Sequence, residues 1–176
     1  YSYKAGVLST KLTDCVVDPP EVFKFKNPEV TLELYERYIN SIKRVMIAGG
    51  EVTLDKGHIK VIEIFKKYKR YDLQIYYQLN MQSLHIGDVF LPDALKDFPL
   101  VEMCGSIDGC DEAFEYIRYG ANWEKTFENI KILSTYPIRA EFNIVVQFFN
   151  FNNIPILIEK LEPVFNKVNV KLENRC

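Results

Sequence analysis

The sequence predicts an α/β fold, a partial (β/α)6-type barrel with parallel strands that is truncated at both ends. From about residue 40 onward, short β-branched and aromatic runs alternate with segments of helical periodicity. Alternation of this kind builds right-handed βαβ units and a parallel sheet. A doubly wound sheet would accommodate the same order of elements, and both architectures hold ligands at the carboxyl ends of their strands.

Length and composition fit this fold class. The chain has 176 residues, of which 48% are hydrophobic and 26% charged, and it contains 12 Phe and 11 Tyr, which favours a well-filled core. The net charge of −2 produces no general attraction to nucleic acid or to an anionic membrane. No apolar run is long enough to span a bilayer, and we expect a cytoplasmic protein. The cysteines form no C-x-x-C pair and are too scattered for a disulfide scaffold: Cys15, Cys104, Cys110 and Cys176.

The elements follow in order along the chain. Residues 1–39 are expected to form an N-terminal segment, partly loop, with a helix that begins at Pro28 or Thr31, and residues 40–176 the β/α core. Asp55 can cap a helix to about Arg70, and Asn152 or Asn153 can cap one to about residue 168. A short helix at 92–97 and a helical stretch at 111–133, broken near Gly120, complete the set. The expected strands are 41–48, 73–79, 100–106, 138–149 and 169–172.

Polar residues gather where three of these strands end. Because the carboxyl ends of parallel strands meet at one rim, these residues are predicted to lie close together. Glycines let a ligand approach the backbone, and a carboxylate can bind a cationic amine through charge-assisted hydrogen bonds. The alternative is structural: a Gly-Gly turn, with Glu51 and Asp108 as helix caps. The rim residues are Gly49, Gly50 and Glu51 after the first strand, Asn80 after the second, and Ser106 and Asp108 after the third.

A family resemblance attaches to the same segments. An apolar strand ending in A-G-G-E resembles the GGE motif of radical S-adenosylmethionine enzymes, and Leu79-Asn80 is similar to the T-N that ends their next strand. The run S-I-D-G at 106–109, followed by F-E-Y-I-R at 114–118, is similar to a further motif of that family. The resemblance spans about residues 40–172, and its aromatic variant resembles members that carry a shortened auxiliary-cluster (twitch) domain.

The resemblance implies a ligand and a role for each residue. Gly49, Gly50 and Glu51 would hold the amino group of S-adenosylmethionine, and Ser106 would contact its ribose or its carboxylate. Arg118 is a second candidate for the carboxylate, while Asn80 and Asp108 would lie at the same rim. In this family a 4Fe–4S cluster reduces S-adenosylmethionine to a 5′-deoxyadenosyl radical, so an external electron donor and a further substrate of unknown identity are implied as partners.

The chain departs from the family pattern at the cluster. The three-thiolate motif C-x-x-x-C-x-x-C is absent from this sequence, so no metal-ligating residue is assigned. Val52 stands where the family usually has Pro, and Leu79 where it usually has Thr. Two interpretations stay open. In the first, the protein is a radical enzyme whose cluster loop is missing from this sequence, with the passage before Pro20 as the place to look. In the second, it is a degenerate, non-catalytic domain that serves as a binding or scaffolding subunit.

Other chemistries have less support. The sequence contains no G-x-G-x-x-G and no G-x-x-x-x-G-K-[ST], so no phosphate-cradling loop is predicted. His58, in the first turn of a helix, and His85, in an expected loop, are the two histidines, and both are interpreted as structural or solvated.

Overall fold

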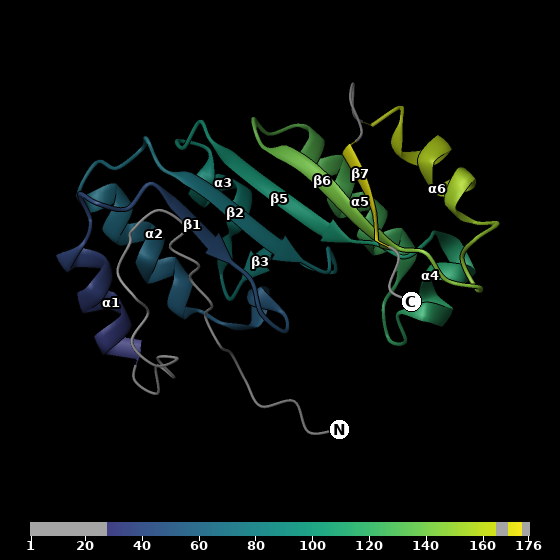
Figure 1. Cartoon of the computed structure of the whole chain (residues 1–176), viewed down its shortest axis with the longest axis horizontal. Helices are drawn as coiled ribbons and strands as arrows, with labels where there is room; N and C mark the ends of the chain where they lie inside the picture. The colour runs from purple at the N-terminus through teal and green to yellow at the C-terminus, as the bar shows by residue number, and fades with distance from the viewer. Residues whose placement is uncertain (1–27, 165–168, 174–176) are drawn as a thin grey trace.

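The computed structural model describes residues 28–164 and 169–173, and its centre is a parallel sheet (Figure 1). The sheet has five strands in the order β1-β2-β5-β6-β7, and every neighbouring pair is parallel. This confirms the α/β class and the expected number of strands. The strands are β1 (Arg44–Ile47), β2 (Gln74–Leu79), β5 (Val101–Ser106), β6 (Arg139–Val145) and β7 (Asn169–Glu173).

The sheet is an open, partial barrel. Within the described residues, β1 and β7 are its two edges and do not pair with each other. Helix α1 precedes β1, and the other helices and short elements lie between the strands in chain order; α3 and α5 lie behind the sheet in Figure 1. They are α1 (Pro28–Arg37), the 3-10 turn η1 (Val52–Leu54), α2 (Gly57–Lys67), the hairpin β3 (His85–Ile86) and β4 (Val89–Phe90), α3 (Leu91–Leu95), α4 (Asp111–Ile117), α5 (Trp123–Ser134) and α6 (Ile154–Leu161).

The two faces of the sheet differ in chemistry. On β2, Ile75, Tyr77 and Leu79 are buried, whereas Tyr76 and Gln78 between them are half-buried. Side chains alternate between the two faces along a strand, so one face joins the apolar core and the other, here called the polar face, carries polar groups. The core contains buried residues of α2, α3 and α5 together with those of the strands. The register of β2, β5 and β6 places Gln78, Cys104 and Glu141 side by side on the polar face.

Helix α2 begins close to its predicted position but is shorter than expected. The carboxylate of Asp55 accepts a hydrogen bond from the Gly57 N–H (2.7 Å), which turns the chain into the helix. The predicted end near Arg70 is wrong, since α2 ends at Lys67. Lys69 adopts a left-handed conformation (φ 55°) and the N–H of Arg70 bonds back to the Phe65 carbonyl (2.9 Å), a closure typical of helix ends.

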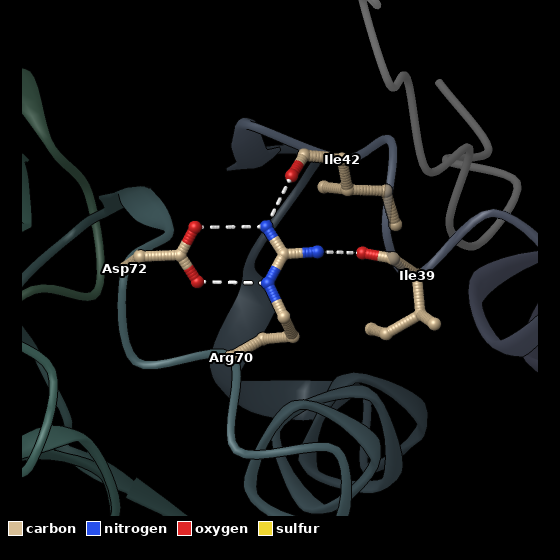
Figure 2. A network of polar contacts seen from close by, with 4 residues as sticks. All are labelled: Ile39, Ile42, Arg70 and Asp72. Atoms are coloured by element: carbon tan, nitrogen blue, oxygen red, sulfur yellow. Dashed lines mark hydrogen bonds and ion pairs between the residues drawn. The ribbon is translucent and has the colours of Figure 1, made fainter.

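Arg70 connects the loop before β1 with the loop before β2, at the amino end of the sheet. Figure 2 shows its guanidinium between the Asp72 carboxylate and the carbonyl oxygens of Ile39 and Ile42. The distances are 2.7 Å from Nε to Asp72 Oδ1, 2.9 Å from Nη2 to Asp72 Oδ2 and 2.7 Å from Nη2 to the Ile42 oxygen. The fixed fork of donors on arginine suits such a site, and this network stabilises the connections into β1 and β2.

Three other predicted boundaries are corrected. The strand expected to reach residue 149 ends at Val145, because the side chain of Asn150 binds the Val145 carbonyl (2.8 Å) and folds the chain into turns. Helix α6 ends at Leu161 rather than near residue 168, since Pro163 offers no N–H to continue it. His85 lies in hairpin strand β3, not in a loop, with its ring against Phe90.

The predicted break of the helical stretch 111–133 near Gly120 is confirmed: this residue has φ 86° and separates α4 from α5. Among the described residues, no helix combines the length and apolarity that a membrane crossing needs. The suspected position of a missing cluster loop, before Pro20, lies outside the described residues.

Candidate functional site

The predicted rim residues lie at the carboxyl ends of three neighbouring strands. Glu51 follows β1, Asn80 follows β2, and Ser106 is the last residue of β5. Because β1, β2 and β5 are parallel neighbours, their ends fall on the same edge of the sheet, where the arrowheads of Figure 1 point. The structure therefore places these residues as the sequence predicts, and it adds the contacts that hold each of them.

The Glu51 carboxylate is held by three hydrogen bonds. Its Oε1 accepts from the N–H and the hydroxyl of Thr53, at 3.2 and 2.8 Å. Its Oε2 accepts from the backbone N–H of Asn80 at 3.1 Å. An ionised carboxylate has about four acceptor positions, so one of them is left for a donor from outside the chain. The side chain is half-buried, which keeps that position within reach of a ligand.

Glu51 is also a cap, as the structural alternative states, but of the short turn η1 rather than of a long helix. The same contact orients the carboxylate, because Thr53 approaches it with both backbone and side chain. The hydroxyl of Thr53 was not predicted as part of this site. A Glu followed two residues later by Thr is compatible with such a bond, but the spacing alone is too common to identify it.

Asn80 contributes its backbone to Glu51 and its side chain to its own loop. Asn80 Oδ1 accepts from the Gln82 N–H at 2.8 Å, and Met81 between them has φ 62°. Gln82 in turn accepts a hydrogen bond from the Asn122 N–H (2.9 Å), which fixes the loop against the start of α5. Asn80 thus lies at the rim as predicted, and its N–H holds the Glu51 carboxylate.

A second polar group lies between the ends of β5 and β6. Asp108 is 7% exposed; its Oδ1 accepts from the Val145 N–H at 2.8 Å, and its Oδ2 pairs with Arg118 Nη2 at 2.8 Å. Asp108 caps no helix: the residue before α4 is Cys110, and its side chain makes no capping bond. Both carboxylate oxygens are engaged within the chain, so Asp108 orients Arg118 and the end of β6.

Asn150 completes this second group and was not predicted. It is fully buried, and its side-chain amide donates to the carbonyls of Asp108 (3.0 Å) and Val145 (2.8 Å). Its Oδ1 accepts from the Gln147 N–H (2.8 Å). The pattern F-F-N-F-N-N offers three asparagines, and nothing in the sequence distinguishes this one from its neighbours.

Two buried polar atoms of the rim have no partner among the described residues. They are Oδ1 of Asn143 and Nε of Arg118. Asn143 is in register with Ser106 across β5 and β6, so the amide oxygen lies next to a serine on the polar face. A buried acceptor and a buried donor without partners are costly, unless a ligand or water satisfies them. The rim therefore offers one free acceptor position on Glu51, whereas the Asn143 oxygen and the Arg118 Nε are buried and become available to a ligand only if the side chains around them move.

The described residues do not fit an iron–sulfur cluster. They contain no group of three or more His, Cys, Asp or Glu side chains that could hold a metal ion. Cys104 and Cys110 are buried, and burial raises the pKa of the Cys110 thiol to about 11, so the thiolate that binds iron is disfavoured there.

No family model matches the sequence, and no curated protein does. Solved structures do match. Streptococcus suis SuiB aligns with a TM-score of 0.63 at 16% identity, over 82% of this chain and 34% of SuiB. The structure of SuiB bound to S-adenosylmethionine gives 0.61 at 16% identity, over 82% of this chain and 34% of that chain. Native anSMEcpe with bound AdoMet and Cp18Cys peptide gives 0.63 at 17% identity, over 83% of this chain and 43% of that chain.

These likenesses show the fold. The open parallel sheet with its helices is a partial barrel whose fold is shared with SuiB and anSMEcpe. The chain spans about a third of the length of SuiB (34%) and less than half of anSMEcpe (43%).

Proposed function

We propose that the chain is the S-adenosylmethionine-binding core of a radical S-adenosylmethionine enzyme, with the ligand at the carboxyl rim of the sheet. The observation that carries this proposal is the Glu51 carboxylate, oriented by Thr53 and Asn80 with one acceptor position left. The ammonium group of the ligand would fill that position. Hydrogen bonds to charged groups contribute about 1.5–3 kcal/mol each, enough to make this contact decisive for affinity.

The other ends of the ligand have candidate partners on the rim. Ser106, at the end of β5, would bind a ribose hydroxyl, and its neighbour Asn143 on β6 would join it after turning its buried amide oxygen toward the ligand. Arg118, held by Asp108 through Nη2, would bind the carboxylate through the exposed part of its guanidinium. Gly49 and Gly50 would let the ligand approach the backbone next to Glu51.

In enzymes of this type a bound 4Fe–4S cluster supplies the electron that cleaves the sulfonium bond of S-adenosylmethionine. Since the described residues offer no ligand set for it, we assign them binding and orientation of S-adenosylmethionine and no step of the radical chemistry. An electron donor and a twitch domain remain predictions of the resemblance.

A second candidate function is a non-catalytic domain that retains S-adenosylmethionine binding. The missing three-cysteine motif and the buried thiols of Cys104 and Cys110 favour it. The two candidates share the ligand and differ only in turnover.

A peptide is the first substrate class to examine. One SuiB structure is bound to its precursor peptide SuiA, and the anSMEcpe structure holds a peptide as well. In this chain, Tyr116, Phe148 and Phe149 form an exposed aromatic cluster on the segments that follow β5 and β6, with ring centroids 5.3 and 5.7 Å apart. Exposed aromatic rings of this kind can bind apolar side chains of a peptide.

The test of binding uses titration calorimetry with two ligands. S-adenosylmethionine should bind the chain, and 5′-methylthioadenosine, which lacks the amine and the carboxylate, should bind more weakly, by about tenfold or more. Equal affinity for the two ligands, or no binding of either, would overturn the proposed site.

The test of turnover uses the natural full-length protein, reconstituted with iron and sulfide without oxygen. Formation of 5′-deoxyadenosine after reduction supports the enzyme, and binding without turnover supports the non-catalytic domain.

A further inference from the structure

His58 is a buried histidine directly behind the turn that carries Glu51. It lies in the first turn of α2 and is 1% exposed. Both ring nitrogens have partners: Nε2 is 2.6 Å from the carbonyl oxygen of Val52, and Nδ1 is 3.0 Å from the hydroxyl of Tyr77. A buried imidazole needs a partner for each ring nitrogen, and here the two partners come from two different elements, the turn after β1 and strand β2.

These partners determine the tautomer. A carbonyl oxygen can only accept a hydrogen bond, so Nε2 must carry the hydrogen. Nδ1 is then bare and accepts the hydrogen of the Tyr77 hydroxyl. The ring is neutral in this arrangement, and burial lowers its pKa, which favours the neutral form.

The contact to Val52 acts on the residue next to Glu51. Val52 begins the 3-10 turn η1, and its carbonyl also accepts from the Asp55 N–H at 3.2 Å. Valine, unlike proline, leaves its own φ free, so the covalent structure of the turn does not fix its geometry. The hydrogen bond from His58 fixes the plane of this carbonyl instead.

The contact to Tyr77 connects the same turn to β2. Tyr77 pairs in register with Ile47 at the end of β1, and Asn80, three residues further along, donates its N–H to Glu51. Two bridges therefore join the turn after β1 to β2. One runs from Glu51 to Asn80 at the rim, and the other from Val52 through His58 to Tyr77 in the core below.

We propose that His58 is a positioning residue for the Glu51 carboxylate: through Val52 and Tyr77 it holds the turn so that the free acceptor position of Glu51 meets the ammonium group of S-adenosylmethionine. The proposal rests on the proposed function for its ligand but not for its geometry. It differs from a purely structural role, in which loss of His58 would lower stability and leave the ligand affinity of the folded protein unchanged.

The experiment compares four variants by calorimetry with S-adenosylmethionine, each at a temperature where it is fully folded. His58→Leu removes the donor, whereas His58→Gln keeps an N–H within reach of Val52. Tyr77→Phe removes the hydroxyl that fixes the tautomer. Phe65→Leu, a core change on the same helix that makes no polar contact with the turn, is the control for lost packing.

We expect His58→Leu to weaken S-adenosylmethionine binding by about tenfold, Tyr77→Phe by less, and His58→Gln and Phe65→Leu by less than about threefold. Equal affinities for His58→Leu and Phe65→Leu would overturn the inference. If His58→Leu does not fold, Tyr77→Phe decides it: a loss of affinity larger than that of Phe65→Leu supports the inference, and an affinity equal to that of the wild type contradicts it.

A spectroscopic measurement separates this inference from the proposed function. Long-range proton–nitrogen correlation spectra of the wild-type protein without ligand should show the hydrogen of His58 on Nε2. Tyr77→Phe should also shift the backbone amide signals of Thr53 and Asn80, which contact Glu51. A hydrogen on Nδ1, or unchanged amide signals, would overturn the positioning role even if S-adenosylmethionine binds. Failure of the wild-type protein to bind S-adenosylmethionine would overturn the proposed function and leave this measurement as the test of the bridge.

Discussion

Glu51 and Asn80 are 29 residues apart in sequence, and the backbone N–H of Asn80 donates a 3.1 Å hydrogen bond to Glu51 Oε2. This bond joins the exits of two neighbouring parallel strands and leaves the carboxylate with one free acceptor position. The bond brings the G-G-E segment after β1 and the L-N segment after β2 into one site. The position of the Glu51 carboxylate therefore depends on the loop after β2 as well as on the turn after β1.

A substitution at Gly50 should affect ligand binding much more than it affects the stability of the fold. A Cβ at this position would meet no atom within 4 Å, and Gly50 is not among the residues with positive φ. Gly50→Ala should therefore change the free energy of unfolding by less than about 1 kcal/mol. If S-adenosylmethionine approaches the backbone here, the same change should weaken binding by about tenfold or more, as calorimetry and urea unfolding together would reveal. Gly105→Ala is the contrasting variant, since its Cβ would lie 2.9 Å from Met81 atoms and should destabilise the fold.

His58 should make stability depend on pH. Its pKa is lowered in the folded chain by burial, partly offset by the bond to Val52 and the charge of Asp55. Between that lowered pKa and the unfolded value of about 6.5, the unfolded state binds more protons, so stability is full above about pH 6.5 and falls as the pH decreases below it. Urea unfolding of wild type at pH 7.5 and 5.5 should show a larger loss than His58→Gln shows. Equal losses would mean that carboxylates alone cause the acid sensitivity.

Asp108 should contribute to stability through its charge. Asp108→Asn keeps an oxygen for the Val145 N–H but removes the partner of Arg118, whose Nε already lacks a hydrogen bond. We expect a loss of roughly 1–3 kcal/mol in the free energy of unfolding, measured by urea denaturation. Glu128→Gln breaks an exposed pair with Lys131 and should cost less than about 0.5 kcal/mol. A loss in Asp108→Asn no larger than in this control would contradict the account.

Arg70 should matter for stability and not for the ligand. Arg70→Leu leaves the carbonyls of Ile39 and Ile42 without their donor (Figure 2). These groups lie before the first residues of β1 and β2, at the end of the sheet opposite the rim. Unfolding should become easier by about 2–4 kcal/mol, while the affinity for S-adenosylmethionine at a temperature where the variant is folded should stay unchanged. Asp72→Ala, which removes the exposed partner, should cost much less. A weaker affinity in Arg70→Leu would show that the two ends of the sheet are coupled.

The sequence was sufficient for the order of the five sheet strands along the chain and for the position of Glu51, Asn80 and Ser106 at the rim. Periodicity identifies β2 and β5, and strand parallelism then brings Glu51, Asn80 and Ser106 to one edge. The contacts that hold the rim could not be predicted, because they join segments far apart in sequence. Asn150 reaches back to Asp108, and that bond also ends β6 earlier than its apolar pattern suggests.

The surroundings of the two histidines could not be predicted from the sequence either. A structural role for His58 could be expected from an apolar helix face, but its partners on η1 and β2 depend on tertiary packing. His85 was expected in a loop, since a two-residue strand is too short to show a period.

The central claim, that Glu51 binds the ammonium group of S-adenosylmethionine, is tested most directly by calorimetry on Glu51→Gln. Glutamine keeps one oxygen for Thr53 or Asn80 but loses the charge, so the affinity should fall by about ten- to a hundredfold. Asp55→Asn removes an equal charge four residues away, from a carboxylate bonded to Gly57, and should leave the affinity within about threefold of wild type. If Glu51→Gln binds S-adenosylmethionine as tightly as Asp55→Asn does, the carboxylate does not hold the ligand and the assignment of the rim is wrong.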